Sequence, residues 1–115
     1  MKMKEILTLL GGRLLCGAPQ DDHEFTSAFA SDMMSDVLAY VKDQSLLLTG
    51  LVNPQVIRTA EMMDFLCIAF VRGKRPDDAM IRLASENNIV LIRTEERMFS
   101  ACGKLYAAGL DGSGL

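Results

Sequence analysis

The chain has 115 residues, of which 50% are hydrophobic and 23% are charged, and its formal net charge is -3. This length and composition predict one globular domain with a hydrophobic core and argue against a disordered chain. The small negative charge argues against duplex nucleic acid as a partner, because duplex binding needs a clustered basic surface. No apolar run approaches the roughly 18 residues that span a bilayer, so we expect no membrane partner and a cytoplasmic protein.

The first part of the chain is predicted to begin with a short helix. This helix covers Met3–Leu10, and Gly11 and Gly12 end it, because glycine readily takes the positive φ that helix ends favour. Three segments then follow, in order an extended piece, a polar loop and a strand, at residues 13–17, 18–22 and 25–30.

A second helix is expected to extend to Val41. Ser31 or Asp32 caps it, since either side chain can accept the free N–H groups of a first helical turn. Its apolar stripe consists of residues at helical spacing, namely Met33, Met34, Val37, Leu38 and Val41.

The rest of the chain repeats an apolar run, a turn and an amphipathic helix. The runs lie at residues 45–49, 66–71 and 89–92, so their starts are 21 and 23 residues apart, the length of one strand and one helix. Near-continuous apolar strands that alternate with helices are typical of a parallel sheet with both faces covered. We therefore expect a single three-layer α/β domain at residues 1–110, with a mainly parallel sheet flanked by helices, and a flexible polar tail at residues 111–115.

The helices of the repeat have recognisable starts. Asn53 caps the first, which extends to about Asp64, and Pro54 fits its first position. The second is expected at residues 77–87, and the third begins after Thr94 as its cap. Their predicted inward-facing residues are Val56, Ile57, Ala60, Met63, Met80, Leu83, Ala84, Met98, Cys102 and Leu105.

The strand ends of this repeat are the predicted binding site. In open α/β sheets, ligands bind beyond the carboxyl ends of the strands, and the helix N-termini there favour anions. The candidate ligand-binding residues are those that follow a strand, namely Ser31, Asp32, Thr49, Gly50, Arg72, Gly73, Lys74 and Thr94. The alternative interpretation is that Gly50 and Gly73 are turn glycines and Arg72 is a surface charge.

Two further groups could carry chemistry. Asp32 and Asp36 are spaced so that both carboxylates could face one way on a helix and hold Mg²⁺ with a phosphate, or they could form a helix cap and a solvated face. His23 lies among acidic residues, where it is either a surface histidine or a catalytic base without an identifiable nucleophile.

Other signatures of catalysis or cofactor binding are missing. The chain has no G-x-x-x-x-G-K-[ST], G-x-G-x-x-G or G-x-S-x-G motif, which argues against a kinase, a dinucleotide oxidoreductase and a serine hydrolase. Cys16, Cys67 and Cys102 lack the spacing of a zinc or iron–sulfur site, so they are interpreted as core residues. We expect no catalytic residue, no metal and no cofactor.

Several short segments together resemble the DRTGG domain family, which is similar in fold to the amino-terminal domain of HPr kinase/phosphorylase. The most specific match is the intact Ser-Asp-x-x-Ser-Asp motif of residues 31–36. The segment that names the family, at residues 22–28, departs from its pattern. It keeps the Asp and the Thr but lacks the Arg, and it reads Thr26-Ser27-Ala28 where the family has Thr-Gly-Gly. The other matching segments are residues 4–6, 11–12, 30–38, 48–50, 53–55, 72–76 and 84–92.

The resemblance implies regulation rather than catalysis. We expect a stand-alone, non-catalytic regulatory or ligand-sensing domain that acts by self-association or by contact with a partner enzyme, and that binds a nucleotide or another phosphorylated ligand. The alternative is a small phosphate- or nucleotide-binding enzyme that uses Asp32, Asp36 and the strand-end pocket. We also expect a homodimer, with the helix at residues 32–41 as its contact, because Met33, Met34 and Tyr40 cannot all face one core.

Overall fold

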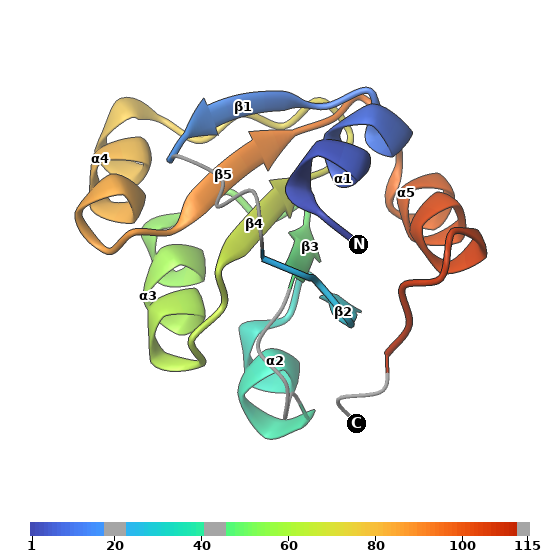
Figure 1. Cartoon of the computed structure of the whole chain (residues 1–115). Coiled ribbons are helices and arrows are strands. Elements are labelled where there is room, and N and C mark those ends of the chain that lie inside the picture. Colours follow the sequence, from blue (N-terminus) through green and yellow to red (C-terminus); the bar gives the residue numbers. More distant parts are fainter. Residues whose placement is uncertain (18–22, 41–45, 113–115) are drawn as a thin grey trace.

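The computed structural model describes residues 1–17, 23–40 and 46–112, which form one layered α/β domain (Figure 1). Five strands make a single sheet in the order β1-β5-β4-β3-β2. The strands are β1 (Arg13–Cys16), β2 (Ala28–Ala30), β3 (Leu46–Thr49), β4 (Cys67–Phe70) and β5 (Val90–Arg93). The helices are α1 (Met3–Leu10), α2 (Met34–Tyr40), α3 (Pro54–Met62), α4 (Asp78–Glu86) and α5 (Met98–Ala107).

The four strands from β2 to β5 are parallel, and each pairs with the next along the chain. This confirms that the three apolar runs of the repeat are neighbouring parallel strands. The short extended piece before them, β1, is antiparallel to β5, with Arg13 opposite Arg93. The predicted fold class, a three-layer domain with a mainly parallel sheet, is therefore confirmed.

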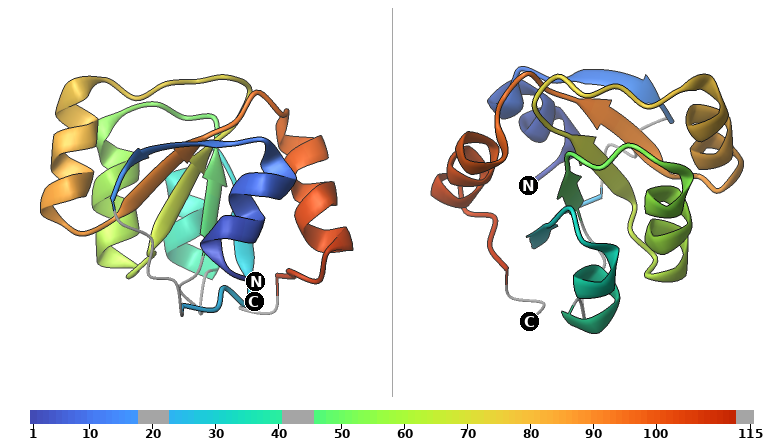
Figure 2. Two further views of the ribbon diagram at one scale, coloured as in Figure 1. Left: turned by 45° about the horizontal axis from the view of Figure 1, so that its top comes forward. Right: turned by 180° about the vertical axis from the view of Figure 1, so that it is seen from behind.

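The two faces of the sheet are covered by different helices (Figure 2). On one face α2, α3 and α4 pack over a core that includes Leu47, Ile68 and Leu91. On the other face α1 and α5 pack over Leu46, Leu48 and Ile92, among others. Successive strand residues point to opposite faces, so a strand covered on both sides must be apolar at nearly every position. The continuous apolar runs therefore mark the central strands.

Local signals set three helix ends, and two of them, Gly11 and Asn53, act as predicted. Gly11 ends α1 in the left-handed conformation, with φ +59°. The Asn53 side chain accepts a hydrogen bond from the Gln55 N–H at 2.9 Å, and Pro54 is the first residue of α3. Asp77 caps α4 by accepting from the Met80 N–H at 2.9 Å. In each case the capping group is local, so it can be identified without knowledge of the fold.

Two predicted helix starts are wrong by two or three residues. Helix α2 begins at Met34, because Ser31 Oγ accepts only the Met33 N–H while Asp32 turns to β3. Helix α5 begins at Met98 rather than at Glu95. Thr94 Oγ1 does accept the Glu96 N–H at 3.1 Å, but this bond forms a turn before the helix. Both errors arise because a side chain that could cap a helix bonds to another element instead.

The apolar stripe of α2 is narrower than predicted. Met34 and Val37 are buried, but 59% of Met33 and 43% of Leu38 are exposed. Val41 and the predicted polar loop at residues 18–22 lie outside the described residues. No helix in the described ranges has the length and hydropathy that a bilayer crossing requires.

The far edge of the sheet is held by the end of the chain. Asp111 forms a parallel bridge with Ser27, and its carbonyl oxygen accepts the Ala28 N–H at 2.8 Å. The residue that opens the predicted tail therefore extends the sheet by one position beside β2.

Candidate functional site

The parallel strands bring most of the predicted site residues to one edge of the sheet. Thr49, Phe70 and Arg93 end their strands side by side in register. Gly50, Arg72 and Thr94 follow within two residues of these ends. The sequence repeat therefore placed them on the same edge, as expected for parallel strands.

One carboxylate gathers the polar groups at the end of β3. Asp32 Oδ1 accepts the Gly50 N–H at 2.6 Å and the Thr49 hydroxyl at 3.1 Å. Arg72 Nη2 lies 3.7 Å from Asp32 Oδ2, and both side chains are about half exposed. We call these four residues the Asp32 cluster. Its backbone N–H, hydroxyl and guanidinium are donors that bind an anion well, and here the anion is the protein's own Asp32.

Glycine at position 50 makes the Asp32 cluster possible. A Cβ atom at Gly50 would collide with the Arg72 guanidinium, which therefore lies directly against this glycine. Arg72 itself takes the left-handed conformation, with φ +62°, and its N–H donates to the Glu96 carbonyl oxygen at 2.8 Å. Few residues other than glycine adopt this conformation readily, so the turn after β4 is held by its tertiary contacts.

The loops after β4 and β5 leave the sheet toward opposite faces, one to α4 and the other to α5 (Figure 1). Such a divergence is where open α/β sheets usually form a ligand crevice. Here the two loops bond to each other, with the Gly73 N–H donating to the Thr94 carbonyl oxygen at 2.8 Å. The Glu95 carboxylate also lies against Gly73, in space that a Cβ atom there would need. The protein's own groups therefore occupy this crevice.

The Arg93 guanidinium hydrogen-bonds to both of these loops. Its Nη2 donates to the Gly73 carbonyl oxygen and to Glu95 Oε1, both at 3.0 Å. Its Nε is buried and has no hydrogen-bond partner among the described residues. Arg93 directly follows the predicted apolar run at residues 89–92, so the sequence places it, like Thr94, at this end of the sheet.

The other predicted site residues differ in their access to a ligand. Thr94 is only 2% exposed, and its hydroxyl donates to the Leu10 carbonyl oxygen at 2.6 Å. It therefore fastens α1 to the end of β5. Lys74 is exposed and follows Arg72 of the Asp32 cluster by two residues. Ser31 is half-buried in the turn that precedes α2.

The predicted acidic pair is not arranged on one helix. Asp32 precedes α2, whereas Asp36 lies within it, so helical spacing does not align the two carboxylates. In the described part of the chain, no group of three or more His, Cys, Asp or Glu side chains could hold a metal ion. The geometry of Asp32 suits the binding of donors at β3 rather than the coordination of a cation.

His23 and Glu24 belong to a segment that packs beside the N-terminus. The His23 ring packs edge-on against Phe25, with ring centroids 4.6 Å apart. The terminal ammonium group of Met1 hydrogen-bonds to Glu24 at 2.7 Å and lowers the pKa of that carboxyl. These contacts describe a packed turn.

The cysteines are free thiols on separate elements. Burial raises the pKa of each of them, and most strongly that of Cys67, which lies in the middle of the sheet. A thiol with a raised pKa is a poor nucleophile, because the thiolate is the reactive form. None of the three therefore has the environment of a catalytic cysteine.

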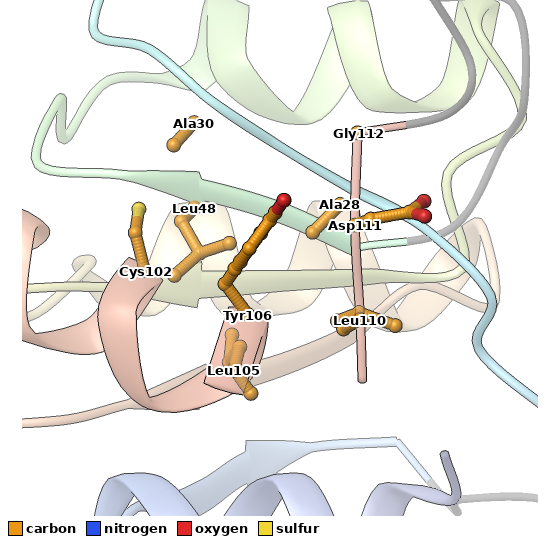
Figure 3. Close-up of a pocket in the computed structure, with 9 residues that line it drawn as sticks. All are labelled: Ala28, Ala30, Leu48, Cys102, Leu105, Tyr106, Leu110, Asp111 and Gly112. Atoms are coloured by element: carbon orange, nitrogen blue, oxygen red, sulfur yellow. The ribbon is translucent and has the colours of Figure 1, made fainter. Parts of the chain in front are cut away.

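A pocket of about 100 Å³ lies on a different part of the sheet, between α5 and the edge strand β2 (Figure 3). It is lined by small and apolar side chains, together with the Tyr106 ring and the Cys102 thiol. The residues that line it are Ala28, Ala30, Leu48, Cys102, Leu105, Tyr106, Leu110, Asp111 and Gly112. Sequence reasoning missed this pocket because its walls come from segments that lie far apart in the chain.

Comparison with known proteins gives a fold likeness. No protein-family model matches the chain, and no curated protein matches it. One solved structure that is similar contains the CBS and DRTGG domains of the regulatory region of Clostridium perfringens pyrophosphatase, complexed with its activator diadenosine tetraphosphate. The two share 16% identity with a TM-score of 0.72, over 90% of this chain and 45% of the other. The chain thus spans about half the length of that regulatory region and shares an α/β fold with part of it.

Proposed function

We propose that this chain is a DRTGG-type regulatory module that senses an anionic, phosphorylated ligand such as a nucleotide. It carries out no catalysis, and it transmits ligand binding by self-association or by contact with a partner enzyme. The Ser-Asp-x-x-Ser-Asp segment and the fold likeness to a regulatory region that contains a DRTGG domain support this proposal. The free cysteines are consistent with a reducing, cytoplasmic location.

The Asp32 cluster is the observation that carries the proposal. Three kinds of donor from β3 and the β4 turn converge on one carboxylate: a backbone N–H, a hydroxyl and a guanidinium. Phosphate oxygens use the same donors, and Arg72 and Lys74 supply the positive charge that a phosphate needs. The proposed ligand-binding residues are Ser31, Thr49, Gly50, Arg72, Gly73 and Lys74. Asp32 occupies the donors of this site in the free protein, and Thr94 holds the adjoining end of β5 in place.

Asp32 must then compete with the ligand. A phosphate that approaches Arg72 meets a carboxylate already paired with that guanidinium at 3.7 Å. Binding therefore requires Arg72, which is half exposed, to turn from Asp32 toward solvent. This competition favours a sensor of modest affinity, because part of the ligand's interaction replaces an existing ion pair.

A ligand panel tests the proposal directly. The melting temperature would be measured with inorganic phosphate, ATP, a sugar phosphate and diadenosine tetraphosphate, each at increasing concentration. A ligand at 100 times its dissociation constant adds about 2.7 kcal/mol to the free energy of unfolding and raises the melting temperature of a domain of this size by roughly 10 °C. A protein whose melting temperature stays constant with every member of the panel is not a sensor of phosphorylated ligands.

A further inference from the structure

Helix α5 is apolar on two sides, although the sheet covers only one of them. Ala101 and Leu105 are buried against the sheet. Phe99 and Tyr106 are seven residues apart, so they lie on one side of the helix, and they are 89% and 71% exposed. Cys102 and Gly103 lie between these rings on the same side. We call Phe99, Cys102, Gly103 and Tyr106 the outer stripe of α5.

The glycine in the outer stripe has no explanation within one chain. Gly103 lies in the middle of α5, where glycine makes a helix less stable than alanine would. A Cβ atom at this position would meet nothing within 4 Å, and its φ is not in the left-handed region. A helix surface without a side chain lets a second helix approach more closely. The glycine is therefore explained if another helix crosses α5 at this point.

The pocket beside α5 offers space for an aromatic ring. Tyr106 and Cys102 of the outer stripe form one wall, and Ala28 and Ala30 of β2 form the opposite wall (Figure 3). Both alanines leave room that larger side chains would fill. The pocket therefore lies beside β2, the last strand at this edge of the sheet.

We infer that a second copy of this chain covers the outer stripe. The two α5 helices cross antiparallel at Gly103, and the exposed Phe99 ring of each copy enters the pocket of the other. The surface is self-complementary, since each chain supplies both a ring and a pocket, as a two-fold interface requires. An antiparallel crossing also brings Arg97, at the start of α5, toward Asp111 of the second copy, which lies beyond the end of its α5. In this arrangement the dipoles of the two helices point in opposite directions, which is favourable.

The required area shows which other segments take part. A stable interface buries about 800 Å² on each partner, whereas the surface of the whole chain is 6278 Å². A helix of 10 residues is about 15 Å long, so α5 alone cannot supply that area. The interface must therefore extend over β2 and the segment from Leu110 to Gly112, which line the pocket.

Light scattering on the full chain at 5 to 200 micromolar tests this surface, because this range spans about 1.5 decades around a dissociation constant of roughly 30 micromolar. We expect a dimer for the wild-type chain and a shift to monomer, by at least tenfold in dissociation constant, for Gly103→Glu and Phe99→Ser. Gly103→Glu has open space in the monomer, so circular dichroism should show an unchanged fold.

Two variants serve as matched controls. Ala79→Glu adds the same charge at an exposed position of α4, on the other face of the sheet, and Met33→Ser removes an exposed apolar side chain just before α2. Both should leave the dimer intact. A wild-type monomer at 200 micromolar, or a dimer that Met33→Ser breaks while Gly103→Glu does not, would overturn the α5 interface.

This surface deepens the self-association that belongs to the proposed function, but its test uses no ligand. A chain that dimerises through α5 and binds no member of the phosphate panel would keep the interface and reject the sensor. A chain that stays monomeric and binds phosphate would reject the interface and keep the sensor.

Discussion

Thr94 is a buried polar residue whose hydroxyl joins two elements that are distant in sequence. It donates to the Leu10 carbonyl oxygen at 2.6 Å and accepts the Glu96 N–H at 3.1 Å. The last carbonyl groups of a helix have no partner within the helix, so the bond from Thr94 satisfies one of them for α1. A residue expected to cap a helix and to bind a ligand is thus placed to hold α1 on the sheet.

Replacing Thr94 with valine keeps the shape of the side chain and removes the hydroxyl. We expect a loss of about 1–3 kcal/mol in the free energy of unfolding, because the Leu10 carbonyl oxygen would be buried without this partner. Urea unfolding of the variant and of Thr94→Ser would measure this. Serine keeps the hydroxyl, so a serine variant as unstable as the valine variant would contradict the role of the hydrogen bond.

Arg72 and Asp32 make opposite contributions to the proposed anion site. Arg72→Ala should weaken phosphate or nucleotide binding by about 1.5–3 kcal/mol, since a charge-assisted hydrogen bond is lost. Asp32→Asn should strengthen binding, because the competing negative charge is removed while an oxygen stays to accept the Gly50 N–H. Isothermal titration with the best ligand of the panel would measure both.

Arg75→Ala is the control for the Arg72 variant. It removes the same charge from an exposed residue of the same turn, outside the Asp32 cluster. An Arg75 variant with the same loss of affinity as the Arg72 variant would show that binding depends on overall charge rather than on this cluster.

At the scale of the elements, the repeat depends on how each helix starts. Asn53 accepts the Gln55 N–H and begins α3 without help from any other part of the fold. Asn53→Ala should therefore lower the free energy of unfolding by about 1 kcal/mol, and Asn53→Asp should have little effect, because aspartate is an equally good cap. Thermal unfolding followed by circular dichroism would show this, and equal losses in both variants would reject the cap as the cause.

For α2 and α5 the sequence predicts a helix correctly but places its first residue wrongly. Both were expected to begin at a polar residue that follows a strand. Asp32 and Thr94 instead bond to β3 and α1, and each helix begins where backbone groups are free to continue it. The sequence contains the capping residue in both cases, but the competing acceptor or donor lies on another element.

At the scale of the whole molecule, the central strand β4 is buried on both sides and contains one ionisable group. Cys67 lies in β4 and is fully buried, and burial raises the pKa of its thiol above the ordinary 9.0. Below pH 9 the thiol is neutral in both the folded and the unfolded states, so it gives no pH dependence. Above pH 9 the unfolded thiol ionises while the folded one stays neutral, so stability falls as the pH rises.

The expected slope from Cys67 approaches about 1.4 kcal/mol per pH unit above pH 9. Urea unfolding at pH 8, 9 and 10 would measure it in the wild-type chain and in Cys67→Ala. The alanine variant should be less stable at pH 8, since a small cavity remains, but its stability should fall less between pH 9 and pH 10. Parallel curves for the two proteins would show that other groups cause the alkaline loss.

The class of the fold could be read from the sequence because its causes are local and periodic. Runs such as residues 66–71 must be apolar on both sides of a buried strand, and Asn53-Pro54 and Gly11 bring their own helix signals. The same periodicity brought Thr49, Gly50 and Arg72 to one edge, since parallel strands end together.

Only the tertiary structure decided what those edge residues bond to. In the folded chain Asp32 accepts the Gly50 N–H, the Glu95 carboxylate lies against Gly73, and the buried Thr94 hydroxyl donates to the end of α1. It also left Phe99 and Tyr106 exposed beside a pocket whose walls come from β2, β3 and α5. A hydrogen bond or a cavity joins residues far apart in the chain, so its partners are determined by the packing of the layers, whereas strand burial and helix capping are determined within a few residues.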